Sequence, residues 1–184
     1  MTTPAKAILI HGNGGCTAAD FWLPSVEHDL RALGLTVINQ TFPDNIKARS
    51  SFWLPFLESL GTDEQTILIG HSSGAMAAMR YAETHRLLGS VLVGVCHTDL
   101  GDRFEAASGY YNRPWPWDQI RANQQWIGIF NSTDDPHIPI AEPRFVAAQL
   151  RGNYFEFTNR GHFTNAAFPE LTDYVRRKLG TTAP

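Results

Sequence analysis

One stretch of this 184-residue chain carries most of the information about its architecture: Thr66-Ile67-Leu68-Ile69-Gly70-His71-Ser72-Ser73-Gly74. The apolar run at 66–69 predicts a buried strand, and the alanine- and methionine-rich run after Gly74 predicts a helix. Between them, Gly-x-Ser-x-Gly predicts a strained turn that lifts Ser72 above the sheet and points the free amides of a helix N-terminus at it. This context favours a catalytic nucleophile; the alternative is a tight turn with a capping serine.

Short apolar runs alternate with helical patterns on both sides of this stretch. The predicted strands span residues 7–10, 36–39, 66–69, 90–95, 126–130 and 154–157. Such alternation predicts βαβ units, and therefore an α/β fold with a doubly wound parallel sheet that has helices on both faces. Residues 96–119 break the pattern, because they are long, aromatic and without clear periodicity. We expect them to form a small cap or pocket wall on a single domain spanning 1–184.

Composition excludes several classes of function. Lys and Arg number 15 against 18 Asp and Glu, which gives a net charge of −3 and no basic footprint for nucleic acid or a membrane surface. The two cysteines, Cys16 and Cys96, lack metal-ligand spacing, so we expect no metal. The apolar run at 7–10 is shorter than the roughly 7–15 residues of a secretory signal or the ~20 of a membrane helix. We therefore expect a cytoplasmic protein.

Candidate partners for Ser72 follow the last two predicted strands. A serine needs a base to take its proton, and in this architecture an acid and then a histidine follow it in the chain. His162 comes after the last strand, at the sheet edge where Ser72 stands, and is the expected base. Asp134 and Asp135 are adjacent, so only one can face His162; we favour Asp135, which opens an Asp-x-x-Ile-Pro segment. The alternatives for the acid are Asp134, Asp99 and Asp102.

A glycine-rich segment, residues 11–15, follows the first predicted strand. A dinucleotide loop would need a glycine at position 17, where Thr17 stands, and an acidic residue after the second strand, where Asn39-Gln40 stands. No Gly-Lys-Ser/Thr occurs either, so we expect no nucleotide cofactor. The segment instead predicts an oxyanion loop, whose backbone amides stabilise developing negative charge. The expected donors are the amides of Asn13 and Ser73.

Aromatic side chains after the first and fourth strands are candidate walls of the substrate crevice. The candidates are Phe21, Trp22, Trp115 and Trp117. Filling of the core is the alternative role for such residues. An aromatic pocket would favour an apolar or aromatic group on the substrate.

The chain resembles the small serine hydrolases of the retinoblastoma-binding protein nine type, within the α/β-hydrolase fold. The resemblance covers about residues 5–179, and among its specific stretches are Gly12-Asn13-Gly14-Gly15, Trp53-Leu54-Pro55-Phe56, Ser132-Thr133-Asp134-Asp135-Pro136 and Gly161-His162-Phe163. It implies a compact six-stranded sheet in the order 2-1-3-4-5-6. It also implies a triad of Ser72, Asp135 and His162. Members hydrolyse small esters and amides, and aminopeptidase-like activity is attributed to some.

One departure from the family concerns protein partners. Some members carry Leu-x-Cys-x-Glu, which docks on the retinoblastoma pocket. Here the stretch is Leu60-Gly61-Thr62-Asp63-Glu64, and Thr62 in place of the cysteine puts retinoblastoma-type binding in doubt. We therefore expect a serine hydrolase that cleaves small ester or amide substrates through an acyl-enzyme on Ser72. The alternative is a protein-interaction module on a hydrolase fold, with weak or no activity.

Overall fold

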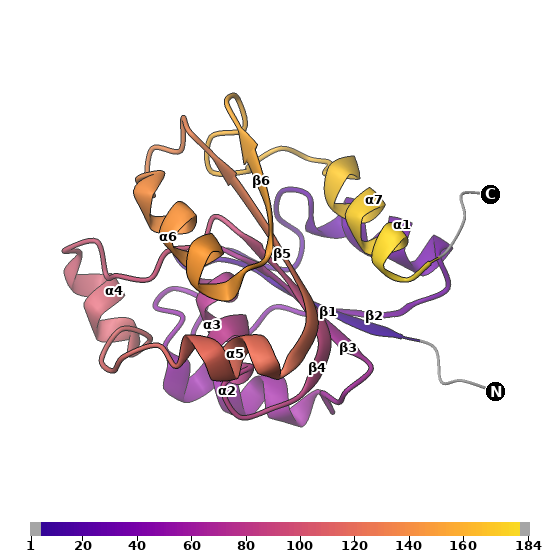
Figure 1. Ribbon diagram of the computed structural model, residues 1–184, viewed down its shortest axis with the longest axis horizontal. Helices are drawn as coiled ribbons and strands as arrows, with labels where there is room; N and C mark the ends of the chain where they lie inside the picture. The colour runs from indigo at the N-terminus through magenta and orange to yellow at the C-terminus, as the bar shows by residue number, and fades with distance from the viewer. Residues whose placement is uncertain (1–4, 181–184) are drawn as a thin grey trace.

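Six strands form one sheet in the computed structural model, which describes residues 5–180 (Figure 1). They are β1 (Lys6–Ile10), β2 (Thr36–Asn39), β3 (Thr66–His71), β4 (Leu87–Val93), β5 (Gln124–Ser132) and β6 (Asn153–Phe157). All neighbouring pairs are parallel, in the order β2-β1-β3-β4-β5-β6. This is the order that the family resemblance implies, and it places the carboxyl ends of β1 and β3 side by side.

The bounds of β4 differ from the prediction of 90–95. The strand begins at Leu87 and ends at Val93. It stops there because Gly94 takes a left-handed conformation, with φ of 61°. The next amide, that of Val95, donates to the side chain of Asn131 rather than to a neighbouring strand. Val95 lies outside the strand but is fully buried in the core, which explains why an apolar residue occurs at this position.

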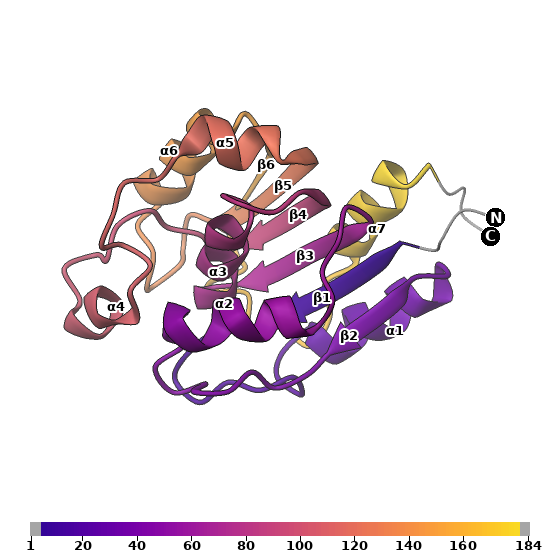
Figure 2. The ribbon, with the colours of Figure 1, turned by 90° about the horizontal axis from the view of Figure 1, so that it is seen from below.

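Helices cover both faces of the sheet (Figure 2). One face carries α1 (Leu23–Ala32) and α7 (Pro169–Lys178); the other carries α2 (Ser50–Ser59), α3 (Ser73–Tyr81), α5 (Trp117–Ala122) and α6 (Ala141–Leu150). Side chains alternate across a strand, so Ile8 and Ile10 pack with α2 and α3, whereas Ala7 and Leu9 pack with α1. The apolar runs of the central strands follow from this burial on both faces.

The segment 96–119 is mostly irregular, with two short helical stretches. It contains α4 (Arg103–Ser108) and the first residues of α5. Asp102 caps α4 by accepting hydrogen bonds from the amides of Phe104 and Glu105, and Gly109 ends it with a φ of 85°. Six residues are too few to show a helical period in the sequence. The helix α4 lies beyond the carboxyl ends of the strands (Figure 2).

The position that would carry the cysteine of the docking motif has a structural role here. Thr62, which occupies the cysteine position of the docking motif, donates a hydrogen bond to the Leu57 carbonyl at the end of α2 and contacts the Tyr81 hydroxyl. Its side chain therefore serves the local structure of α2.

Among residues 5–180, none of the helices has the length and hydropathy needed to cross a membrane.

Candidate active site

Ser72 occupies the turn between β3 and α3. Its φ of 52° and ψ of −123° form a strained conformation that non-glycine residues rarely adopt. The two flanking glycines make this turn possible. A Cβ at Gly70 would lie 2.2 Å from the Gly74 carbonyl oxygen, and one at Gly74 would lie 2.3 Å from the Ile10 carbonyl oxygen. The pattern Gly-x-Ser-x-Gly is thus a packing requirement of this turn, and Ser72 stands half-buried at the carboxyl edge of the sheet.

Asp135 and His162 form a hydrogen-bonded pair. The imidazole Nδ1 of His162 lies 2.8 Å from Oδ2 of Asp135, whose side chain is only 2% exposed. The other carboxylate oxygen accepts hydrogen bonds from the amides of His137 (2.8 Å) and Ile138 (3.1 Å). Burial by itself would raise the pKa of Asp135, but the hydrogen bond and charge of His162, with these two amides, lower it below its ordinary value. The carboxylate therefore stays ionised and fixes the orientation of the imidazole.

The other candidate acids serve the local backbone instead. Asp134 accepts hydrogen bonds from the Ser132 hydroxyl and from the amide of Gly161, 3.0 Å away. Asp99 accepts from the amide of Gly101, and Asp102 caps α4. Of these four carboxylates, only Asp135 contacts His162.

His162 and Ser72 contact the same or adjoining residues. The amide of Ser72 donates to the Val93 carbonyl (2.8 Å), and the next residue, Gly94, lies against the His162 ring. His71, which precedes Ser72, has its Nε2 at 2.8 Å from the His162 carbonyl oxygen. Burial lowers the pKa of His71 to about 3, so its ring is neutral and Nε2–H donates to that carbonyl. Within residues 5–180 the Ser72 hydroxyl makes no hydrogen bond; such catalytic contacts often tighten only when substrate binds.

The segment 11–15 lies against Ser72. A Cβ at Gly12 would be 3.3 Å from Cβ of Ser72. Burial lowers the pKa of His11, and the neutral ring accepts a hydrogen bond from the Phe42 amide through Nε2 and contacts the Gly12 carbonyl through Nδ1. In the described part of the chain, the amides of Asn13 and Ser73 have no hydrogen-bond acceptor. Two free amides therefore flank the nucleophile turn.

Glu105 of α4 is a site residue that sequence reasoning missed. Its Oε1 accepts a hydrogen bond from the Asn13 side chain (2.7 Å), and its Oε2 accepts one from the Tyr111 hydroxyl (3.4 Å). Burial raises the pKa of this carboxyl group. No signal in the sequence pointed to it, because 92 residues separate it from Asn13.

The predicted wall residues differ in their surroundings. Phe21 is half-buried and packs edge-on against the His71 ring, with centroids 5.7 Å apart. Trp22 is 1% exposed and packs against His71 and Phe168, so in this structure it is a core residue with no surface for a ligand. Trp115 and Trp117 are half-buried and stacked, with centroids 5.7 Å apart.

The polar groups at this edge of the sheet match acid–base chemistry better than metal binding. Among residues 5–180, no group of three or more His, Cys, Asp or Glu side chains is arranged to hold a metal ion. What the edge does hold is a strained serine, an oriented imidazole and free backbone amides. Together with the doubly wound sheet, these features define the class as an α/β-hydrolase.

Comparison with known proteins gives the family. The serine hydrolase family matches residues 7–175. The rat protein serine hydrolase RBBP9 (Rattus norvegicus) is 48% identical over 182 residues, which cover 97% of this chain and 98% of the rat protein. The chain belongs to the serine hydrolase family, as the resemblance predicted, and is a hydrolase.

Solved structures confirm the fold. The ydeN gene product of Bacillus subtilis superposes with a TM-score of 0.88 at 21% identity, covering 96% of this chain and all of the other. Est1E from Butyrivibrio proteoclasticus superposes with a TM-score of 0.76 at 13% identity, covering 97% of this chain and 90% of the other. At these identities the likeness shows the α/β-hydrolase architecture alone.

Proposed function

We propose that this protein cleaves small carboxylic esters or amides through an acyl-enzyme on Ser72. The observation that carries the proposal is the hydrogen-bonded Asp135–His162 pair at the sheet edge that also holds the strained Ser72. A serine becomes an effective nucleophile when an oriented base removes its proton. His162 is the proposed base, and Asp135 is the carboxylate that orients it.

In acylation, Oγ of Ser72 attacks the carbonyl carbon of the substrate while Nε2 of His162 takes the hydroxyl proton. The carbonyl π electrons move to oxygen, and the amides of Asn13 and Ser73 stabilise that oxyanion. Each such donor contributes roughly 2.7–4 kcal/mol to transition-state stabilisation. Asp135, ionised because of its hydrogen bonds, stabilises the imidazolium.

Three proton transfers complete the reaction. His162 first gives its proton to the leaving alcohol or amine as the bond to the acyl carbon breaks. It then takes a proton from water, whose oxygen attacks the acyl-enzyme, and returns that proton to Ser72 as the carboxylic acid leaves. The same nitrogen acts as base and acid in turn.

The half-buried aromatic residues support a preference for apolar groups. We propose that Phe21, Trp115 and Trp117 contact the substrate and that residues 96–119 form the small cap above it. Trp117 also packs edge-on against the half-exposed Phe145. A compact cap fits small substrates better than folded proteins.

Covalent labelling tests the nucleophile directly. The purified protein would be treated with a fluorophosphonate, which phosphonylates an activated serine, and the modified residue would be mapped by mass spectrometry. We expect labelling at Ser72, none in Ser72→Ala, and turnover of a p-nitrophenyl ester or an aminoacyl anilide. Folded protein that stays unlabelled and inactive would contradict the proposal and favour an interaction module.

Two adjacent carboxylates offer a matched control for the acid. Asp135→Asn removes the charge that stabilises the imidazolium, so we expect kcat to fall by roughly 10³- to 10⁴-fold. Asp134→Asn keeps an acceptor for the Ser132 hydroxyl and the Gly161 amide, so kcat should stay within about tenfold of the unmodified enzyme. Equal losses in the two variants would exclude Asp135 from the proposed role.

A further inference from the structure

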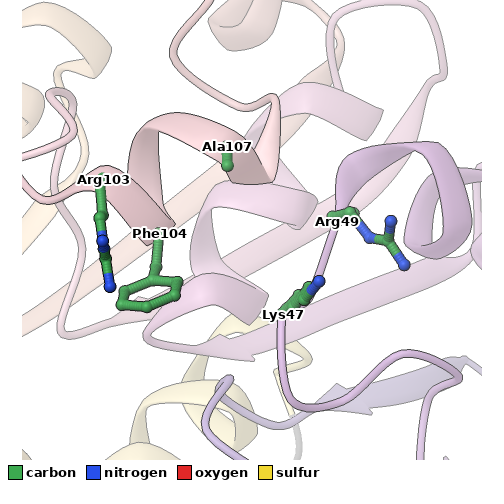
Figure 3. A pocket seen from close by; sticks show the side chains of 5 residues that line it. All are labelled: Lys47, Arg49, Arg103, Phe104 and Ala107. Atoms are coloured by element: carbon green, nitrogen blue, oxygen red, sulfur yellow. The ribbon is translucent and has the colours of Figure 1, made fainter.

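A cationic pocket lies on the far side of α4 from Glu105. Its volume is about 400 Å³, and it is lined by Lys47, Arg49, Arg103, Phe104 and Ala107. Figure 3 shows α4 on one side, carrying the last three of these residues, and the segment with Lys47 and Arg49 across from it. The lining thus combines three basic side chains with one aromatic ring, on a protein whose net charge is −3.

Two of the three cations are available to a ligand. Arg49 is committed to Asp44 by paired hydrogen bonds of 2.7 and 3.0 Å. In the described residues, Lys47 and Arg103 make no ion pair. Arg103 lies 4.7 Å from the centre of the Phe104 ring, which is 61% exposed. Asp102, which precedes Arg103 in the chain, caps α4, and the charge of Lys47 lowers the pKa of the nearby Asp44. The pocket therefore presents two basic side chains that, within residues 5–180, have no ion-pair partner, next to an exposed apolar ring.

A strained turn holds the Lys47 side of the pocket. Asp44 and Ala48 both adopt left-handed conformations, with φ of 54° and 48°, although neither is glycine. The amides of Lys47 and Ala48 donate to the Asp44 carbonyl, and Arg49 clamps the Asp44 side chain. Such strain persists only where the surroundings over-determine it. The position of Lys47 is thus fixed by the fold.

Both walls of the pocket are tied to the segment 11–15 that flanks Ser72. On one side, the amides of Gly14 and Gly15 donate to the carbonyls of Ile46 and Asn45 at 3.0 and 3.1 Å. On the other side, the Asn13 side chain donates to Glu105 of α4. Hydrogen bonds of residues adjoining both walls thus connect the pocket to the segment that carries the proposed oxyanion loop.

We propose that this pocket binds the anionic end of an amphiphilic ligand, a carboxylate or phosphate attached to an apolar chain. Lys47 and Arg103 pair with the anion, and Phe104 packs against the adjoining chain. Building on the proposed function, the pocket selects ester or amide substrates that carry such an anion at the end remote from the scissile bond.

Direct binding tests the pocket without reference to catalysis. Titration calorimetry would measure octanoate, octyl phosphate and the neutral octyl glucoside against the unmodified enzyme and against Lys47→Met/Arg103→Met, which keeps the length of the stems. We expect the double variant to weaken binding of the preferred anion about tenfold or more, equivalent to about 1.4 kcal/mol per tenfold. Arg86→Met, at an exposed cation elsewhere, is the control and should bind normally.

Kinetics test the link to the substrate. p-Nitrophenyl butyrate would be compared with the mono-p-nitrophenyl ester of adipic acid, which carries a free carboxylate. In the double variant, KM for the acidic ester should rise about tenfold while KM for the butyrate stays unchanged. Phe104→Ala should weaken octanoate binding while leaving the difference between the two esters in place.

The proposed anion binding would be overturned if the double variant bound octanoate and octyl phosphate normally. It would also be overturned if the unmodified enzyme bound octyl glucoside as tightly as it binds these anions. Association with phosphatidylglycerol vesicles in place of the soluble amphiphiles would also overturn it, in favour of a membrane surface. Failure to hydrolyse either ester, with anion binding intact and dependent on Lys47 and Arg103, would remove the proposed catalysis and keep the anion site.

Discussion

Glycine positions at the carboxyl ends of the strands determine where the imidazole of His162 can lie. At Gly94 a Cβ would approach Cε1 of His162 to 3.2 Å and Nδ1 to 3.5 Å. Gly94 also has a φ of 61°, which an L-residue with a side chain rarely adopts. This glycine therefore combines a backbone role, ending β4, with a packing role beside the proposed base.

The two roles of Gly94 can be separated by a pair of variants. Gly94→Ala should move His162 and lower kcat roughly tenfold or more, because small misplacements of a catalytic group are costly. Gly101→Ala has a similar strain, with φ of 72°, but meets no atom within 4 Å, so it should reduce stability by about 1 kcal/mol and leave kcat unchanged. Steady-state kinetics and urea unfolding would check both variants; equal kcat values would show that Gly94 serves the backbone alone.

At this scale, sequence reasoning could propose residues whose pattern is local. The turn around Ser72 depends on glycines two positions away on either side, and the choice of Asp135 rested on its place before Ile138. Glu105 was beyond such reasoning, because its role arises from a contact between segments far apart in the chain. Trp22 was expected in the crevice, but the structure packs it against Phe168 from the far end of the chain.

At the scale of elements, Arg80 connects α3 to the segment that follows α4. Its side chain is 1% exposed, and its guanidinium pairs with the buried Glu83 and donates to the backbone carbonyls of Tyr110 and Arg113. It also lies 3.5 Å from the centre of the Trp115 ring. Carbonyls of an irregular segment, which have no strand or helix partners, are thus satisfied by one buried cation.

Removing this cation should destabilise the whole molecule. Arg80→Met leaves the buried Glu83 with only the half-exposed Arg113, and it leaves the carbonyls of the segment without donors. We expect the free energy of unfolding to fall by about 3–5 kcal/mol. Arg86→Met, which breaks an exposed pair at 3.9 Å, should cost at most about 1 kcal/mol. Urea denaturation would measure both, and similar losses would refute the anchoring role.

Elements with regular periods were predictable, and elements held by side chains were less so. The strands β1 and β3 are apolar because helices cover both faces, and that pattern is visible in the sequence. The helix α4 is short and depends on the Asp102 cap and the Asn13–Glu105 contact. The turn at 44–48 uses left-handed Asp44 and Ala48, positions where no glycine signals the conformation.

For the molecule as a whole, buried side chains that are uncharged in the folded protein limit the pH range of full stability, both below and above pH 7. Burial lowers the pKa of His71 to about 3 and also lowers that of His11. Burial raises the pKa of Cys96 and of Tyr81 to about 12. Below the ordinary histidine pKa of 6.5, these two histidines bind protons in the unfolded chain but stay unprotonated in the folded chain. Above the ordinary pKa values of 9.0 and 10.0 the unfolded chain releases protons that the folded chain retains.

Stability should therefore be level between about pH 7 and 9 and decline on both sides. Below pH 6.5, each buried neutral histidine lowers the free energy of unfolding by up to about 1.4 kcal/mol per pH unit. His71→Gln, which keeps a donor for the His162 carbonyl but does not titrate, should remove one such contribution. Urea unfolding between pH 4.5 and 7.5 avoids the carboxylate Asp135, whose pKa lies below its ordinary 3.8. An unchanged slope in His71→Gln would show that this ring is protonated in the folded protein or that other groups govern the acid decline.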